Sequence, residues 1–250
     1  MANPLIRASV FTDAVSEAGE RRMTMAGTAH KAMLLLALVI LGVLYSWGTV
    51  RGSGAEAGPA MSSTAMPLMF GGLIGGLVFC LITVFKVSWS PFTAPAYAIC
   101  EGLFLGVISA MYAQVYHGIV MQAVGLTLCV FLLMLTLYSF RVIRATPGFV
   151  MGVFAATGAI GLFYLVTIVL GLFGVTVPFI FSNGWIGIGF SLVVVGIAAL
   201  NLILDFAIIE EGVRGGAPKY MEWYGAFALM VTLIWLYLEI LRLLSKLNRR

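Results

Sequence analysis

Long apolar stretches, separated by short polar or turn-forming segments, run through most of the sequence. About 20 apolar residues are enough to cross a bilayer as a helix. Seven such stretches follow a polar N-terminal arm over residues 1–30, so the pattern predicts a domain of seven transmembrane helices over residues 31–247. Residues 86–95, with two prolines, and 210–219, with three glycines, are expected to form turns. The expected helices span about 33–50, 67–85, 94–115, 119–140, 149–172, 185–209 and 220–244.

The composition agrees with a membrane protein. Of the 250 residues, 62% are hydrophobic and 10% are charged, whereas a soluble domain has about 25% charged residues. So few charges cannot cover a water-exposed surface. The sequence therefore predicts an all-α integral membrane protein with a seven-transmembrane-helix bundle. A soluble enzyme is excluded, and so is a nucleic-acid-binding protein, because the basic residues are scattered between apolar stretches.

The basic residues indicate the orientation, because Lys and Arg are enriched in cytoplasmic loops. A cytoplasmic N-terminus puts only Arg51 in the outer loops and most other basic residues on the inner side. The inner residues are Arg21, Arg22, Lys31, Lys86, Arg141, Arg144, Arg214 and Lys219. The C-terminal end disagrees, since Arg242, Lys246, Arg249 and Arg250 would then lie outside. We nevertheless expect the last helix to cross the membrane, because its apolar part carries charge only at its edge, at Glu222.

The sequence contains no motif of a common enzyme or structural metal site. Cys80, Cys100 and Cys129 lie in apolar stretches without CxxC spacing, so we expect them to pack in helices rather than to form disulfides or metal sites. Neither an HExxH helix nor a GxSxG turn is present. A retinal-dependent pump would need a lysine in the middle of its last helix, and Lys246 lies beyond the expected end. We therefore expect neither an enzyme nor a bound cofactor.

Glycines recur four residues apart at Gly71/Gly75, Gly72/Gly76 and Gly102/Gly106. Small residues at this spacing let helices approach closely in lipid. We expect Gly72 and Gly102 to be contact points that tolerate Ala but not Leu.

Three acidic residues, Glu101, Asp205 and Glu239, lie inside the expected helices. An ionisable group there is costly and indicates a functional site. Glu101 is about 10 Å from the cytoplasmic end of its helix and Asp205 about 6–9 Å, so the two carboxylates could face each other. Glu239 lies near the outer boundary beside Arg242, where a purely structural role is favoured.

Tyr97 and Asn201 lie one helical turn before Glu101 and Asp205, so each shares a face with its acid. Two close carboxylates without a basic partner would hold one proton between them. This arrangement suits a proton-responsive gate, or an oxygen-ligand site for a hard cation such as Ca²⁺ formed by Asp205 and Glu101. In the alternative interpretation, each acid is protonated and hydrogen-bonded to a neighbouring helix.

The segment LNLILDFAIIEEG (200–212) combines a buried Asp205, the run Ile208-Ile209-Glu210 and a glycine-rich turn, and Tyr220 then opens the last helix. This pattern resembles the Bax inhibitor-1 family, also called the transmembrane Bax-inhibitor-motif family, and within it the bacterial YccA-type branch. EGLFLG (101–106) and LEILRLLSKL (238–247) agree with the resemblance, which covers residues 25–247.

The resemblance implies a seven-helix bundle with a central last helix and a pH-sensitive Ca²⁺ leak across a bacterial inner membrane. In this family a pair of aspartates on the sixth and seventh helices controls the leak. Asp205 matches the first aspartate, but the position of the second falls near Thr232, with Glu239 two turns further on. Glu101 could supply the missing carboxylate.

Two functions therefore stay open. The first is a proton-sensitive cation leak channel, in which Asp205, Glu101 and Asn201 sense protons and Thr232, Glu239 and Glu210 are secondary candidates. The second is a non-conducting membrane regulator that binds a membrane protease or another membrane partner, since family members are also linked to such control.

Overall fold

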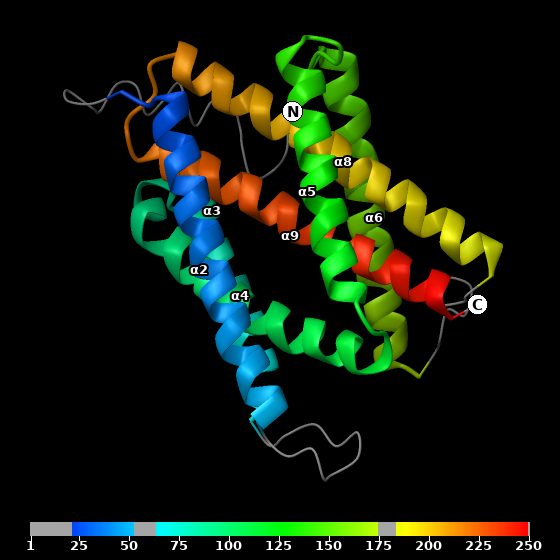
Figure 1. The fold of residues 1–250 in the computed structure, drawn as a ribbon. Coiled ribbons are helices and arrows are strands. Elements are labelled where there is room, and N and C mark those ends of the chain that lie inside the picture. The colour runs from blue at the N-terminus through cyan, green and yellow to red at the C-terminus, as the bar shows by residue number, and fades with distance from the viewer. Residues whose placement is uncertain (1–21, 53–63, 175–183, 250) are drawn as a thin grey trace. The chain divides into compact units, whose positions relative to one another are not determined.

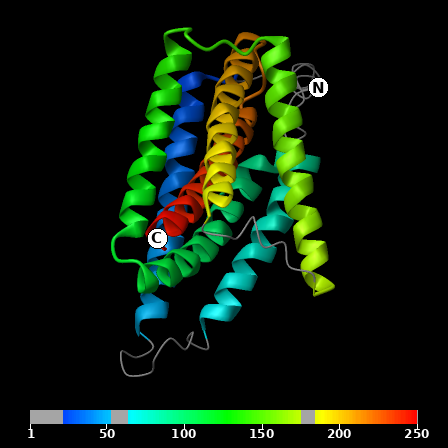
Figure 2. The same cartoon turned by 90° about the vertical axis from the view of Figure 1, so that its right-hand side faces the viewer.

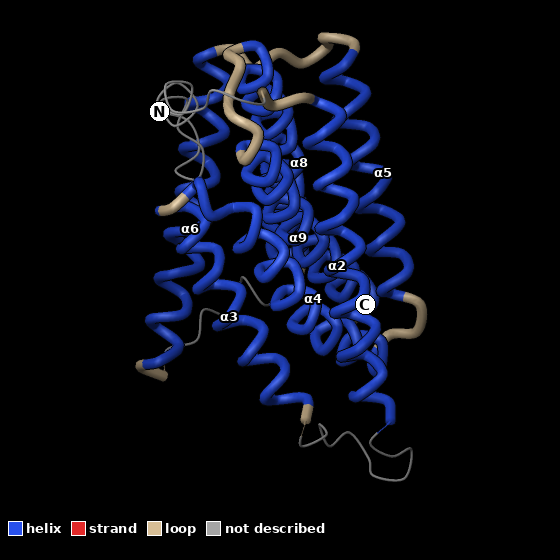
Figure 3. Tube along the Cα trace, turned by 90° about the vertical axis from the view of Figure 1, so that its left-hand side faces the viewer, coloured by secondary structure: helices blue, strands red, loops and turns tan. Residues whose placement is uncertain are grey.

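The computed structural model describes residues 22–52, 64–174 and 184–249, and it is helical almost throughout this part of the chain (Figures 1 and 3). Seven of its helices are long and apolar enough to cross a membrane. These are α2 (Met25–Gly52), α3 (Ala65–Phe85), α4 (Ser90–Val115), α5 (Ile119–Ser139), α6 (Pro147–Leu172), α8 (Trp185–Arg214) and α9 (Met221–Asn248). The 3₁₀ turn η1 (Val87–Trp89) precedes α4. The predicted fold class, a seven-helix membrane protein, is confirmed.

Several helix ends differ from the sequence prediction. α2 begins at Met25, so the end of the predicted polar arm is already helical, while residues 1–21 lie outside the described part. The predicted turn over residues 86–95 is shorter, because α4 begins at Ser90 and contains both of its prolines. Pro91 removes no helical hydrogen bond, since the first four amides have no partner within the helix. Pro95 lies inside the helix, where it lacks an amide hydrogen to donate.

The last two helices also extend further than predicted. α8 continues through Glu210 to Arg214, and these two side chains form an ion pair one turn apart that supports the added turn. α9 continues to Asn248, so Arg242 and Lys246 belong to the helix rather than to a tail.

The chain divides into two compact units, and each is described by itself. Unit 2 contains α2, α3, η1 and α4, with the end of α8 from Ile208 and the start of α9 up to Met230. Unit 1 contains α5, α6, α8 up to Ala207 and α9 from Val231. The turn that connects α8 to α9 can be followed in orange in Figure 2. α8 and α9 are also the most buried of the seven helices. In their most apolar 18-residue stretches, 61% and 50% of the residues are buried.

In unit 2, α4 packs against both α2 and α3 through glycines. A Cβ atom added at Gly102 would lie 2.5 Å from the Val39 carbonyl oxygen, and one added at Gly72 would lie 2.6 Å from the Cys100 carbonyl oxygen. The prediction that these positions are helix contacts is confirmed. The expectation that they tolerate Ala is wrong, because the neighbouring atoms are backbone and cannot rotate away.

Gly102→Ala is expected to destabilise the protein by about 1–3 kcal/mol, because α2 and α4 must separate to admit the methyl group. Gly71 provides a matched control, since a Cβ atom there meets nothing within 4 Å. Gly71→Ala should be neutral or slightly stabilising, because Ala favours helix more than Gly does. Thermal unfolding of the two variants in detergent measures the difference, and equal midpoints would contradict the contact.

Candidate functional site

Asp205, on α8 in unit 1, is fully buried at 0% exposure. Neither of its carboxylate oxygens has a hydrogen-bond partner among the described residues. The Thr232 hydroxyl on α9 lies within interaction range of the carboxylate, although not in good hydrogen-bond geometry. Moving an unpaired charge out of water is expensive. A carboxylate in this setting therefore needs a proton, a cation or water to be stable.

Asn201 does not assist Asp205 as the sequence analysis predicted. Its side-chain amide donates to the Thr157 hydroxyl of α6 at 2.8 Å and to the Ile197 carbonyl of its own helix at 2.9 Å. Both amide hydrogens are thus engaged away from the acid. Asn201 connects α8 to α6 instead, one turn from Asp205.

Glu101, on α4 in unit 2, is partly buried and lies against α3 at a glycine. An added Cβ atom on Gly76 would be 2.7 Å from the Glu101 Oε1 atom, so the carboxylate uses the space that this glycine leaves. Tyr97 and Cys80 interact with it electrostatically, and the Tyr97 ring packs edge-on against Phe227 at 5.0 Å. The predicted proximity of Tyr97 and Glu101 is therefore confirmed.

Asp205 and Glu101 belong to different units, so their pairing stays a prediction. Within the described ranges, no group of three or more His, Cys, Asp or Glu side chains could hold a metal ion. A Ca²⁺ site built on these two carboxylates would need carbonyl oxygens or water to complete the six to eight ligands that Ca²⁺ takes.

Glu239 is 2% exposed and is fully engaged by two neighbours. Arg242 forms an ion pair with it at 3.0 Å, and the Tyr164 hydroxyl of α6 donates to it at 2.9 Å. Arg242 Nη1 also donates to the Tyr164 oxygen at 2.6 Å. The predicted contact with Arg242 is confirmed, and this neutralised group favours the structural role. Glu210, in unit 2, forms an ion pair with Arg214.

Glu222 is a buried site that sequence reasoning missed. Its carboxylate is 0% exposed and accepts hydrogen bonds from the Thr24 backbone N–H at 3.0 Å and the Thr24 hydroxyl at 2.9 Å. Lys31, inside α2, forms an ion pair with it. The carboxylate thus lies at the positive N-terminal end of α2, which stabilises an anion. Gly27 leaves room for it, since a Cβ atom there would be 2.1 Å from Glu222 Oε1.

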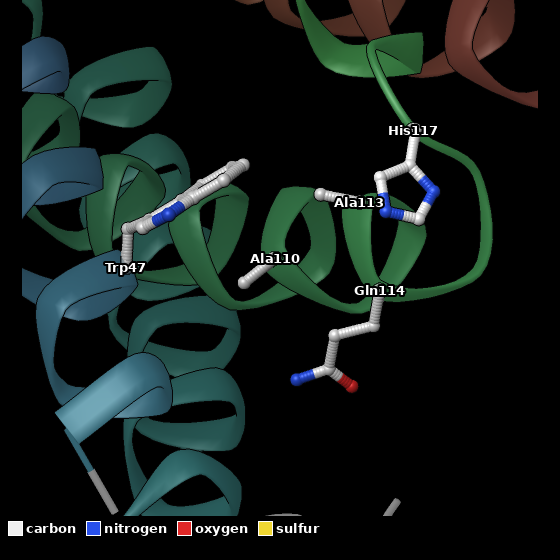
Figure 4. A pocket seen from close by; sticks show the side chains of 5 residues that line it. All are labelled: Trp47, Ala110, Ala113, Gln114 and His117. Carbon is white, nitrogen blue, oxygen red and sulfur yellow. The ribbon is translucent and has the colours of Figure 1, made fainter. Parts of the chain in front are cut away.

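A hollow of about 250 Å³ opens in unit 2 between the last turns of α2 and α4. Figure 4 shows the rings of Trp47 and His117 on either side of Ala113, with the Gln114 amide below them. Indole, imidazole and amide groups line this hollow together with alanines, and no carboxylate of the described residues does. It is therefore poorly suited to hold a hard cation and is separate from the acidic residues.

A family model described as Bax inhibitor 1 like matches residues 3–249, nearly the whole chain. The chain belongs to the Bax inhibitor-1-like family. No curated protein matches the chain. No solved structure matches it either. Membership in this family identifies a multi-pass membrane protein embedded in a lipid bilayer. The resemblance seen in the sequence is thereby confirmed for the family.

Proposed function

We propose that this protein, which we place in the YccA-type branch, is a proton-sensitive leak channel for Ca²⁺ or similar cations in a bacterial inner membrane, and not an enzyme. The observation that carries the proposal is the buried Asp205 carboxylate, which has no hydrogen-bond partner in the described part of the chain. A structural acid would be expected to have satisfied oxygens, as Glu239 and Glu222 do. A proton and a metal cation can each neutralise the Asp205 carboxylate. Binding of one therefore opposes binding of the other.

Asp205→Asn is expected to abolish the pH dependence of cation flux, because the amide cannot gain or lose a proton in this range. The measurement is Ca²⁺ flux into proteoliposomes of the purified protein between pH 5 and pH 8. Glu211→Gln is the matched control, since it removes an exposed carboxylate six residues further along the same helix. Its flux should keep the wild-type pH response. Flux that depends on pH equally in the wild type and in Asp205→Asn would reject Asp205 as the sensor.

If the wild type conducts no cation at any pH, the channel is excluded and the non-conducting regulator becomes the better explanation. In that case a membrane protease or another membrane protein is the partner to seek by cross-linking in the native membrane.

We further propose that the N-terminus and the turn after α8 face the cytoplasm, because the basic residues concentrate on that side. Seven crossings then place the end of α9 outside. A reporter enzyme that is active only in the cytoplasm should be active when fused before α2 and inactive when fused after residue 250. Activity at the C-terminal fusion would show that the number of crossings is even.

A further inference from the structure

Two contacts in unit 1 fix the register between α8 and α9. Lys246 Nζ on α9 donates to the Ser191 hydroxyl of α8 at 2.8 Å and to the Gly187 carbonyl at 2.9 Å. Further along, the Thr232 hydroxyl of α9 lies near the Asp205 carboxylate of α8, without a hydrogen bond between them. The same number of residues separates the two contacts on each helix, so the helices run antiparallel without a shift in register. Figure 2 shows this part of α8, in yellow, beside the red C-terminal part of α9.

The polar residues of α9 at this interface recur every seven residues, which is two helical turns and one face of a helix. Glu239 lies midway between Thr232 and Lys246 on α9. α6 follows the same spacing. Its Thr157 hydroxyl accepts a hydrogen bond from Asn201, and seven residues later the Tyr164 hydroxyl donates one to Glu239. Polar groups thus lie at three successive levels, which we call the polar ladder. α9 contributes to all three levels, α6 to the first two, and α8 to the first and the last. Its members are Asp205, Thr232, Asn201 and Thr157, then Glu239, Tyr164 and Arg242, and finally Lys246, Ser191 and Gly187.

At 1.5 Å per residue, neighbouring levels are about 10 Å apart and the polar ladder is about 20 Å long. That length is most of the hydrocarbon thickness of a bilayer, about 30 Å. Lipid-facing helices gain nothing from such groups, because polar side chains inside a membrane are costly unless they serve a pathway or a contact. The ladder extends from Asp205 along the interface between α8 and α9 to Lys246, near the end of α9.

Lys246 is the unusual member of the ladder. Its side chain is buried, with 4% of the residue exposed, although a lysine near a helix end can normally extend its charge into water. Its ammonium is bound by one backbone carbonyl oxygen and one hydroxyl oxygen. Oxygens of these kinds replace the water shell of a metal cation in channels and binding sites. The ammonium thus lies where a mobile cation would be coordinated.

We propose that the Gly187 carbonyl and the Ser191 hydroxyl form a cation site at the end of the polar ladder, and that Lys246 keeps it closed by occupying it as a tethered cation. The inference rests on the proposed leak function and specifies how one end of its pathway is closed. The site would accept Na⁺, K⁺ or Ca²⁺ once the ammonium is absent. Glu239 and Arg242 are the charged groups on the preceding turns of α9, and their own ion pair keeps that level neutral.

The test compares Lys246→Met, which removes the charge and keeps the side-chain length, with Lys219→Met. Lys219 is an exposed lysine in the turn before α9. Ca²⁺ flux in proteoliposomes should rise roughly tenfold for Lys246→Met, as expected when a cation is removed from a narrow site, and should not change for Lys219→Met. Ser191→Ala, which keeps the lysine and removes one of its ligands, should raise the flux less. If Lys246→Met does not fold, Ser191→Ala alone decides, and unchanged flux overturns the inference.

A binding measurement separates this inference from the proposed function. In detergent, Ca²⁺ or Na⁺ at tenfold its dissociation constant should raise the Tm of Lys246→Met by about 3 °C. The double variant Lys246→Met/Ser191→Ala should lack this shift. A shift without flux in any variant would reject the leak function and keep the cation site. Asp205-dependent flux in the wild type, with no added flux and no shift for Lys246→Met, would reject the cation site and keep the leak function.

Discussion

Lys31→Met is expected to destabilise the folded protein by about 3 kcal/mol, because it leaves the Glu222 carboxylate buried with only Thr24 as a partner. For a chain of this length the loss corresponds to a fall in Tm of about 6–12 °C. Thermal unfolding in detergent at a fixed pH measures it. The reason for the size of the effect is that the remaining charge cannot reach water, since Glu222 is 0% exposed.

The double variant Lys31→Met/Glu222→Gln should recover part of the loss, because it removes both charges together and keeps a carbonyl oxygen for Thr24. Lys86→Met is the control, since Lys86 is exposed and lies over the Trp89 ring at 4.3 Å. That variant should lose at most about 1 kcal/mol, the value of an exposed cation–π contact. A double variant as unstable as the sum of its two single variants would show that the ion pair does not couple the two residues.

Glu101→Gln is expected to abolish the pH dependence of flux as completely as Asp205→Asn does, if the two acids hold one proton between them. Groups that act as a unit give non-additive effects, so the double variant should be no worse than either single variant. The measurement is the same pH series of Ca²⁺ flux in proteoliposomes. Glu211→Gln, on an exposed carboxylate of α8, is the matched control and should retain the pH response.

A normal pH response in Glu101→Gln would separate Glu101 from Asp205. The proton would then be shared with groups that face Asp205 within unit 1, and Thr232 with bound water is the first candidate. Thr232→Val, which removes the hydroxyl and keeps the shape of the side chain, would identify it by a changed pH response at unchanged protein stability.

The apolar pattern predicted the ends of a helix correctly where turn-forming or charged residues mark them. α5 was placed over residues 119–140 and is found over Ile119–Ser139, because His117 and Gly118 precede it and Arg141 follows it. Prolines and glycines misled the prediction elsewhere. Pro91 and Pro95 suggested a turn, but Pro91 fits the first turn of α4 and Pro95 lies inside that helix. The glycines of residues 210–219 suggested a loop, but Glu210 and Arg214 attract each other one turn apart on a helix.

The site was predictable where a charge interrupts an apolar stretch, as at Asp205 and Glu239. Glu222 was missed because it lies at the edge of such a stretch, and its partners are nearly the whole chain away in sequence. Asn201 was assigned to the wrong partner, because helical spacing shows which residues share a face but not which neighbouring helix offers a hydroxyl. Lys246 was placed beyond the last helix because the apolar stretch was taken to end near residue 244, whereas α9 continues to Asn248.

The contact of Glu222 with Thr24 and Lys31 can form only late in the synthesis of the chain. Thr24, which caps the start of α2, is bound by a residue made 198 positions later. At bacterial or eukaryotic elongation rates of about 5–20 residues per second, the start of α2 waits roughly 10–40 s for its acid. During that interval the Lys31 ammonium and the Thr24 amide must be hydrogen-bonded by water or lipid headgroups. A chain truncated before α9 therefore keeps an exposed cationic helix start, which a membrane quality-control protease could recognise.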